Sequence, residues 1–287
     1  MRKWVDKYLT EVANNNDNIK LIIADVGDFP LFSSQHPKKF INAGVSESNA
    51  IGLAAGLSSQ GFQVFVYGVS SFFLYRAYEQ LKFSVAYWKK NITFIGVGFG
   101  WKYYNIGIGH FCPDDILLVQ TLPSMDIYTP YLLSQLKKVL NEQCINPRYL
   151  RLTANIVEED ACVKFPNKEF VIVSYGEMVK SCLKVIKQLN EISLDIGFVA
   201  LNNLKDDYVS LSLAPYKKST VIVVEDQCKR GGIYPQLLEK DFYRVHRIGL
   251  PLLPDKVANT RKELLEMYGL DDHSICKKIK DIVLKYG

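Results

Sequence analysis

The strongest constraint on the fold is a regular alternation of short β-rich runs with helical segments. In the first half, helical patterns begin near Val5, Glu47, Ser71 and Pro130, and the β-rich runs cover residues 21–26, 40–45, 64–69, 92–98 and 149–154. Parallel strands need long crossover connections, which are usually helices. The alternation therefore predicts an α/β fold with a mostly parallel sheet covered by helices on both faces.

The same rhythm starts again after a polar stretch with a proline and no clear periodicity, residues 155–169. Runs at 170–176, 195–201, 220–226 and 243–249 read as strands, with a helical pattern over 178–192, a Gly-Gly turn at 231–232 and two helices at the C-terminus. We expect two doubly wound domains, residues 1–154 and a smaller one at 170–287, joined by a linker over 155–169.

Composition narrows the possible classes of protein. The 287 residues are 48% hydrophobic and 23% charged, and the net charge of +5 is spread along the chain, which argues against nucleic-acid binding. The six cysteines form no CxxC pair and no zinc spacing, so we expect reduced, partly buried thiols. No signal peptide and no bilayer-length apolar run is evident, so a soluble cytoplasmic protein without membrane association is expected.

Candidate functional residues follow the strands, because ligands of such sheets bind at the carboxyl ends of the strands. These candidates are Asp25, Glu47, 70–73, the loop 98–110, and Glu225 with Asp226. A simpler interpretation exists for two of them. Glu47 can be an acid that complements a helix dipole, and His110 can be a structural histidine. The glycines fit no phosphate-loop or dinucleotide spacing, and neither a nucleophilic triad nor a metal cluster is evident.

Six segments, taken in order, resemble the C-terminal half of transketolase and of 1-deoxyxylulose-phosphate synthase. They are IIADVG (22–27), GVSESNAIGLAAGLSSQG (44–61), SSFFLYRAYEQLKF (70–83), GIGHFCPDD (107–115), LPSMDIYTP (122–130) and VIVVEDQCKRGG (221–232). The resemblance covers nearly the whole chain. It implies a pyrimidine-binding domain over 1–154 and a transketolase C-terminal-like domain over 170–287.

The resemblance also implies a thiamine diphosphate site with catalytic roles for Glu47 and His110. The acid at the position of Glu47 hydrogen-bonds to the aminopyrimidine ring and assists removal of the thiazolium proton, whereas His110 stabilises charge on a substrate carbonyl oxygen. Asp25, Phe73 and Arg76 match cofactor-binding positions, with the Phe73 ring against the pyrimidine. Alternatively, Phe72 or Phe73 belongs to the core.

Departures from the family pattern concern the substrate. Gly98 falls where a second channel histidine is expected, Ile106 where an aspartate reads a sugar hydroxyl, and Ala154 where an arginine grips a sugar phosphate. Lys102 and Arg151 either supply positive charge that binds a substrate phosphate or are solvated surface residues. We therefore expect an unusual acceptor, such as a modified or nucleotide-linked sugar.

The family's Mg²⁺-binding GDG motif, which holds the cofactor diphosphate, does not occur in this sequence. The resemblance thus implies a separate partner subunit that carries the diphosphate and Mg²⁺ domain, with this chain as the C-terminal subunit of a split transketolase. An α2β2 assembly and an apolar surface patch that favours self-association are expected.

Two other functions remain open at this point. The β subunit of a 2-oxoacid dehydrogenase or oxidoreductase shares the two domains and the glutamate, but RAYEQLKF and GIGHFCPDD favour the transketolase type. A non-catalytic regulatory subunit would explain the lost groups at Gly98 and Ala154, although the retained Glu47 and Phe73 argue against it. No catalytic role is assigned to Glu225, Asp226 or the glycines at 231–232.

Overall fold

The computed structural model describes residues 1–103, 105–157, 169–251 and 258–287, which form two compact units. The first unit consists of Met1–Phe99 and Leu118–Ala154, and the second of Gly100–Leu117 and Asn155–Gly287. The segment Gly100–Leu117 thus groups with the second unit, whereas a boundary at residue 154 assigns it to the first. Most of the expected linker, residues 158–168, lies outside the described residues.

The first unit contains a six-stranded sheet in the order β2-β1-β3-β4-β6-β5, in which every paired strand is parallel to its neighbour. Its strands are β1 Ile19–Ile23, β2 Phe40–Asn42, β3 Gln63–Val69, β4 Ile92–Val97, β5 Asp126–Tyr128 and β6 Arg148–Arg151. The predicted parallel α/β fold is confirmed. Strand β5 was not predicted, because its three residues follow a proline-containing turn and form no apolar run of their own.

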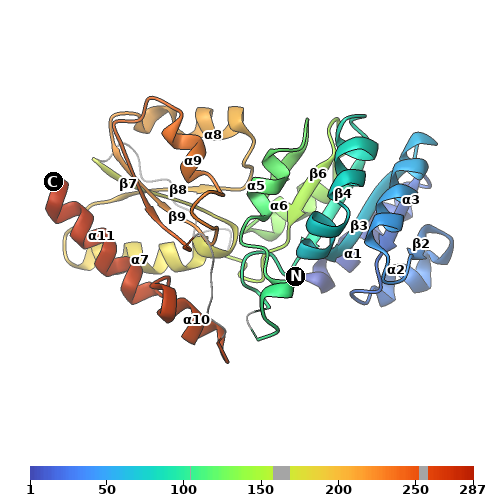
Figure 1. The fold of residues 1–287 in the computed structure, drawn as a ribbon, viewed down its shortest axis with the longest axis horizontal. Helices are drawn as coiled ribbons and strands as arrows, with labels where there is room; N and C mark the ends of the chain where they lie inside the picture. Colours follow the sequence, from blue (N-terminus) through green and yellow to red (C-terminus); the bar gives the residue numbers. More distant parts are fainter. Residues whose placement is uncertain (104, 158–168, 252–257) are drawn as a thin grey trace. The chain divides into compact units, whose positions relative to one another are not determined.

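Helices cover both faces of this sheet (Figure 1). The helices α1 Arg2–Asn15, α2 Pro30–Gln35 and α6 Leu133–Asn141 bury their apolar side chains in one core with β1, β3, β4 and β6. The helix α3 Glu47–Ser59, the π-helical turns η2 Phe72–Arg76 and η3 Leu81–Ala86, and the short α4 Tyr78–Gln80 pack together beside β3. Helix α5, Asp115–Gln120, contains the boundary between the two units.

The strand register decides which side chains share a face of the sheet. Ile22 pairs with Val66, and Val66 with Phe94, so these three lie in one row on one face of the sheet. Their neighbours Tyr67 and Ile95 point to the opposite face, into the core with α1. Every residue of β3 is buried, as expected for a central strand covered on both sides.

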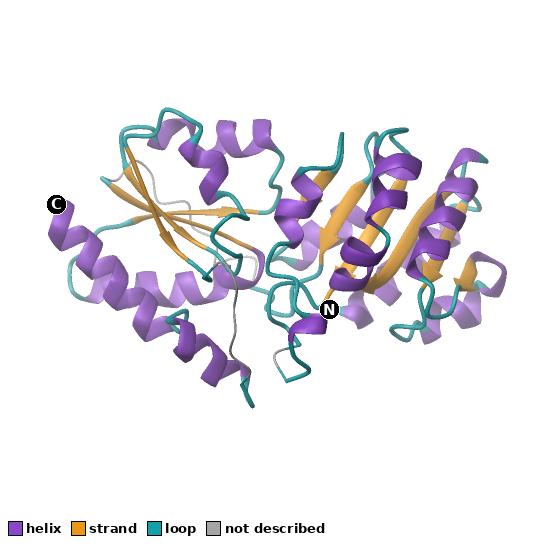
Figure 2. Cartoon of the chain, in the orientation of Figure 1, coloured by secondary structure: helices purple, strands orange, loops and turns teal. Residues whose placement is uncertain are grey.

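The second unit contains a four-stranded parallel sheet in the order β10-β9-β7-β8. Its strands are β7 Phe170–Tyr175, β8 Gly197–Leu201, β9 Thr220–Val224 and β10 Arg244–Ile248, and its helices are α7 Val179–Glu191, α8 Asp206–Leu213, α9 Tyr234–Leu238, α10 Arg261–Tyr268 and α11 Asp272–Tyr286. Helices α8 and α9 lie on one side of this sheet and α7 and α11 on the other (Figure 2). A second α/β domain with its own parallel sheet is confirmed.

The cysteines within the described residues are free and buried, as the sequence predicted: Cys112, Cys144, Cys182, Cys228 and Cys276. Burial raises the pKa of the Cys182 thiol to about 12, which keeps it protonated and unreactive at neutral pH. None of the helices in the described ranges is long and apolar enough to cross a bilayer.

Candidate cofactor and substrate site

The first unit brings Glu47 and Arg76 together. Glu47 is the first residue of α3, and only 5% of it is exposed. Its Oε1 lies 3.5 Å from Nη1 of Arg76, the last residue of η2, whose side chain is about half exposed. The N-terminus of α3 favours a negative charge at this position, but it does not require burial. The carboxylate is therefore buried, whereas its cationic partner reaches the surface.

Asn42 fixes the chain ahead of Glu47. Its side chain exchanges two hydrogen bonds with Asp25: the Asp25 N–H donates to Oδ1 at 3.2 Å, and Nδ2 donates to the Asp25 carboxylate at 3.2 Å. Oδ1 also accepts from the Gly44 N–H at 3.0 Å. Asp25 itself has a φ of +50°, a backbone conformation that aspartate and asparagine tolerate better than most residues. Asn42 was not predicted as a site residue, although an asparagine that ends a strand is a turn signal.

The two phenylalanines of η2 lie in different environments. Phe73 is buried, with its ring edge-on to Phe94 at 6.4 Å between centroids, so in this chain it packs in the core beside β3. Phe72 is half-buried, and the Arg76 guanidinium lies 4.0 Å above its ring. Phe73 is therefore the more deeply buried of the two rings. The ring that shares Arg76 with Glu47 is Phe72.

Two glycines that were not among the predicted site residues, Gly68 and Gly96, make room on this face of the sheet. A Cβ atom at Gly68 would lie 2.0 Å from Cε2 of Phe73, and one at Gly96 would lie 2.5 Å from both the Ser70 hydroxyl and the Tyr149 ring. The Tyr149 hydroxyl donates to Ser70 Oγ at 2.8 Å in this space. The glycines therefore allow the 70–73 segment to pack directly on β3 and β4.

Gly68→Ala should lower the free energy of unfolding of the chain by about 1–3 kcal/mol, because the added methyl group displaces the Phe73 ring. Urea denaturation measures this difference. Gly56→Ala is the matched control, since a Cβ there meets nothing within 4 Å, and alanine in α3 should stabilise the chain by about 0.5–1 kcal/mol. Equal effects of the two substitutions would contradict the packing described for Gly68.

His110 belongs to the second unit. It ends the single 3-10 turn η4, Ile108–His110, which follows Gly107 with a φ of +97°. Its imidazole is half-buried and edge-on to the Tyr103 ring at 5.7 Å. An antiparallel bridge between Gly100 and Cys112 closes this loop at its base. The imidazole is therefore partly accessible to solvent and carried by a closed loop rather than by a long element.

Lys102 and Arg151 are not solvated surface charges, so that alternative is wrong for both. The Lys102 ammonium lies 3.2 Å from the buried carboxylate of Glu177 within the second unit. Arg151 is only 1% exposed, with its guanidinium 3.9 Å above the Phe99 ring in the first unit. The sequence left both placements open because it does not reveal which apolar or acidic groups will cover a cation.

The residues of the first unit suit the pyrimidine end of a thiamine cofactor. A buried carboxylate offers an acceptor to a heterocyclic nitrogen, and Phe72 and Phe73 offer aromatic surface near it. The hydroxyl of Ser71, directly before these rings, is buried and has no hydrogen-bond partner among the described residues. A buried hydroxyl without a partner is costly, so a polar ligand group at this place is chemically consistent. Within the described residues no cluster of three or more His, Cys, Asp and Glu side chains could hold a metal ion.

Comparison with known proteins identifies both halves of the chain. The model of the transketolase pyrimidine-binding domain matches residues 1–158, and that of the transketolase C-terminal domain matches residues 159–275. An apulose-4-phosphate transketolase subunit of Phocaeicola vulgatus is 28% identical over 305 residues, covering 99% of this chain and 97% of that protein. 1-Deoxy-D-xylulose-5-phosphate synthase of Clostridium acetobutylicum is 27% identical over 96% of this chain, which spans about half (48%) of that enzyme.

Among solved structures, a split-gene transketolase described as an inactive beta4 tetramer has a TM-score of 0.81 at 24% identity, over 98% of this chain and 97% of that one. This likeness confirms the fold. Since the two domain models together match residues 1–275, this chain belongs to the transketolase family, of which it contains the pyrimidine-binding and C-terminal domains.

Proposed function

We propose that this chain is the C-terminal subunit of a split, thiamine diphosphate-dependent transketolase-like enzyme that transfers a two-carbon unit to a sugar or related carbonyl acceptor. The observation that carries the proposal is the buried carboxylate of Glu47 at the start of α3, paired only loosely at 3.5 Å with the exposed Arg76, inside a family pyrimidine-binding domain. The near full-length match to a relative that is named as one subunit of a transketolase supports the subunit assignment.

Each site residue has a stated task in this proposal. Glu47 would share a proton with the pyrimidine ring of the cofactor, and the half-exposed Arg76 would leave the carboxylate for solvent or ligand. Asp25, which Asn42 holds just after β1, would contribute to binding the cofactor. When bound, thiamine diphosphate supplies the carbon nucleophile and electron sink for breaking and forming carbon-carbon bonds. His110 donates a hydrogen bond to the substrate carbonyl oxygen as it gains negative charge.

A partner subunit supplies the diphosphate site and its Mg²⁺ ligands in this proposal, in an α2β2 assembly. Large apolar side chains exposed on residues 75–88 support an interface on the first unit: Tyr75, Phe83, Tyr87 and Trp88. Clustered exposed aromatic residues mark interaction surfaces more often than chance positions do. Association with the partner, or self-association in its absence, would bury them.

The proposed acceptor is a sugar derivative whose recognition does not depend on the side chains with which the family usually binds sugar phosphates. Ile106 is 55% exposed, which leaves an apolar side chain where the family reads a hydroxyl. Arg151 is the cation nearest in sequence to Ala154, but its guanidinium is buried on Phe99, and Lys102 is paired with Glu177. A relative named for apulose 4-phosphate supports a ketose phosphate as the first donor to test.

In the test, this chain is mixed with a second polypeptide that carries the GDG domain, and thiamine diphosphate and Mg²⁺ are added. Pairs of a ketose phosphate donor and an aldehyde acceptor are then supplied. Mass spectrometry should detect a product two carbons longer than the acceptor only when both polypeptides are present. Turnover of a 2-oxoacid with lipoyl transfer would instead favour a dehydrogenase subunit. Unchanged turnover with Glu47→Ala would favour a regulatory role for the chain.

Phe73→Leu should weaken thiamine diphosphate binding by the assembled enzyme about tenfold, because an aromatic contact with the pyrimidine is lost. Phe72→Leu is the matched control from the same turn, with a half-buried ring instead of a buried one. The dissociation constants of thiamine diphosphate, measured by calorimetry for the two variants, show which of the two rings contacts the cofactor. A larger loss for Phe72→Leu would transfer the stacking role to that residue.

A further inference from the structure

The segment that carries His110 is attached to the second unit at its first residues. The Lys102 ammonium lies 3.2 Å from Oε2 of Glu177, whose Oε1 lies 3.3 Å from the Arg261 guanidinium. Glu177 is buried in the turn Gly176–Met178 that precedes α7. The adjacent Trp101 ring packs on Tyr268 at 4.3 Å between centroids. A buried carboxylate shared by two cations is a strong anchor, because losing either cation leaves charge poorly compensated.

A second anchor holds the end of the same segment. The Gln227 side chain donates from Nε2 to Oδ1 of Asp115 at 2.7 Å, and both residues are completely buried. One residue further on, the Cys228 N–H donates to the Pro113 carbonyl at 2.7 Å. A hydrogen bond to a buried carboxylate is among the stronger hydrogen bonds in proteins, because no water is available to solvate the charge if the bond is lost.

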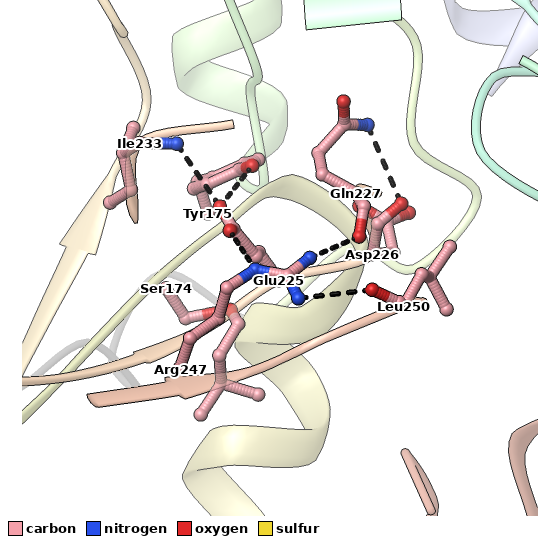
Figure 3. A network of polar contacts seen from close by, with 9 residues as sticks. Ser174, Tyr175, Glu225, Asp226, Gln227, Ile233, Arg247 and Leu250 are labelled. Carbon is pink, nitrogen blue, oxygen red and sulfur yellow. Dashed lines mark hydrogen bonds and ion pairs between the residues drawn. The ribbon is translucent and has the colours of Figure 1, made fainter. Parts of the chain in front are cut away.

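Gln227 is itself held in place from the sheet. Its carbonyl accepts a hydrogen bond from the Arg247 guanidinium and another from the Leu250 N–H at 3.0 Å. Arg247 in turn donates from Nε to the buried Glu225 at 2.8 Å (Figure 3). The residues directly after β9 therefore form one connected set of contacts that ends on the His110 segment.

We infer that Glu177 and Gln227 are positioning residues for His110: the C-terminal domain holds residues 100–117 at both ends and so fixes the loop between them. This inference rests on the proposed function, in which His110 contacts the substrate. It gives a task to the segment VIVVEDQCKRGG, for which no catalytic role was predicted. The task is positioning, since none of its residues is argued to contact the substrate.

Hydrogen exchange on the full chain tests the anchor at Gln227. Gln227→Asn shortens the side chain by one methylene, so amide exchange in peptides within 105–113 should rise about tenfold while β7 and β9 stay protected. Adding Asp115→Glu restores the combined length and should return the exchange toward that of the native chain. Gln236→Asn is the matched control, because Gln236 makes an equivalent 2.7 Å bond to the exposed Asp206 away from this loop.

Unchanged exchange over 105–113 in both Gln227→Asn and Glu177→Gln would overturn the inference. If exchange rises over β7 and β9 as well, the double variant decides: recovery supports a specific contact, and failure to recover contradicts it.

Kinetics of the assembled enzyme separate this inference from the proposed function. Gln227→Asn should lower kcat about tenfold and leave the affinity for thiamine diphosphate within about twofold, because a displaced catalytic group costs rate rather than cofactor binding. His110→Ala is measured beside it. If His110→Ala lowers kcat and Gln227→Asn does not, the positioning inference fails. If neither variant lowers kcat, the role given to His110 in the proposed function fails.

Discussion

Glu47→Gln should lower kcat of the assembled enzyme about a thousandfold, since the amide cannot exchange a proton with the pyrimidine ring. The fold should tolerate the change, because glutamine has the same shape and can still accept a hydrogen bond at the start of α3. The steady-state kcat and the rate of deuterium exchange at the thiazolium carbon of the bound cofactor should fall together. Thiamine diphosphate binding should weaken far less than kcat.

Glu79→Gln is the matched control for this substitution. Glu79 is an exposed acid in the middle of the short helix α4, so its neutralisation should leave kcat within about twofold. A Glu47→Gln enzyme that retains normal kcat would contradict the proton-transfer role. It would also restore the simpler explanation, in which Glu47 only complements the dipole of α3.

Arg247→Met should lower the free energy of unfolding of the chain by about 3–5 kcal/mol, because it leaves the buried carboxylate of Glu225 without its cation. Glu225 is completely buried and accepts hydrogen bonds from Arg247 Nε at 2.8 Å, the Tyr175 hydroxyl at 2.8 Å and the Ile233 N–H at 3.1 Å (Figure 3). Denaturant unfolding measures the loss. The exposed pair of Lys240 and Asp206 at 2.8 Å gives the control, since Lys240→Met should cost at most about 1 kcal/mol.

The cost of Arg247→Met should grow as the pH rises. Burial raises the pKa of Glu225, whereas Arg247 lowers it. Above the ordinary value of 4.5, the unfolded chain loses the proton of Glu225 before the folded chain does, so folding stability falls as the pH passes through that interval. Removing Arg247 raises the folded pKa further and extends the interval upward. The loss of stability should therefore be larger at about pH 8 than at about pH 5.

The double variant Glu225→Gln/Arg247→Met should recover much of the lost stability, because it removes the uncompensated charge together with its partner. A double variant that is no more stable than Arg247→Met would contradict the ion-pair explanation. A loss independent of pH would point to packing around the Arg247 side chain instead.

The long elements could be predicted because their periodicity is strong. The strands around Val66, Ile95 and Val223 are short apolar runs of the kind that a covered parallel sheet requires, and α7 shows a clear apolar face. The short α2, α5, α8, α9 and β5 were missed because three to eight residues contain too little of a period.

The site could be predicted only as far as single residues. Glu47 and Arg76 were both expected near a cofactor, but their pairing depends on the start of α3 meeting the end of η2. Asn42 and Gly68 were not singled out, because a reciprocal side-chain contact and the space for an aromatic ring exist only in three dimensions. Likewise, the grouping of residues 100–117 with the second unit rests on long-range contacts such as Lys102 with Glu177.

The most direct test of the central claim is a calorimetric titration of thiamine diphosphate with Mg²⁺ into this chain alone and into its mixture with a polypeptide that carries the GDG domain. If the cofactor site is shared between two subunits, tight binding of thiamine diphosphate should occur only in the mixture. The mixture with the Glu47→Gln variant should still bind the cofactor but should not turn over substrate. Equally tight binding to the chain alone, or no binding in a mixture that forms a stable complex, would contradict the shared site.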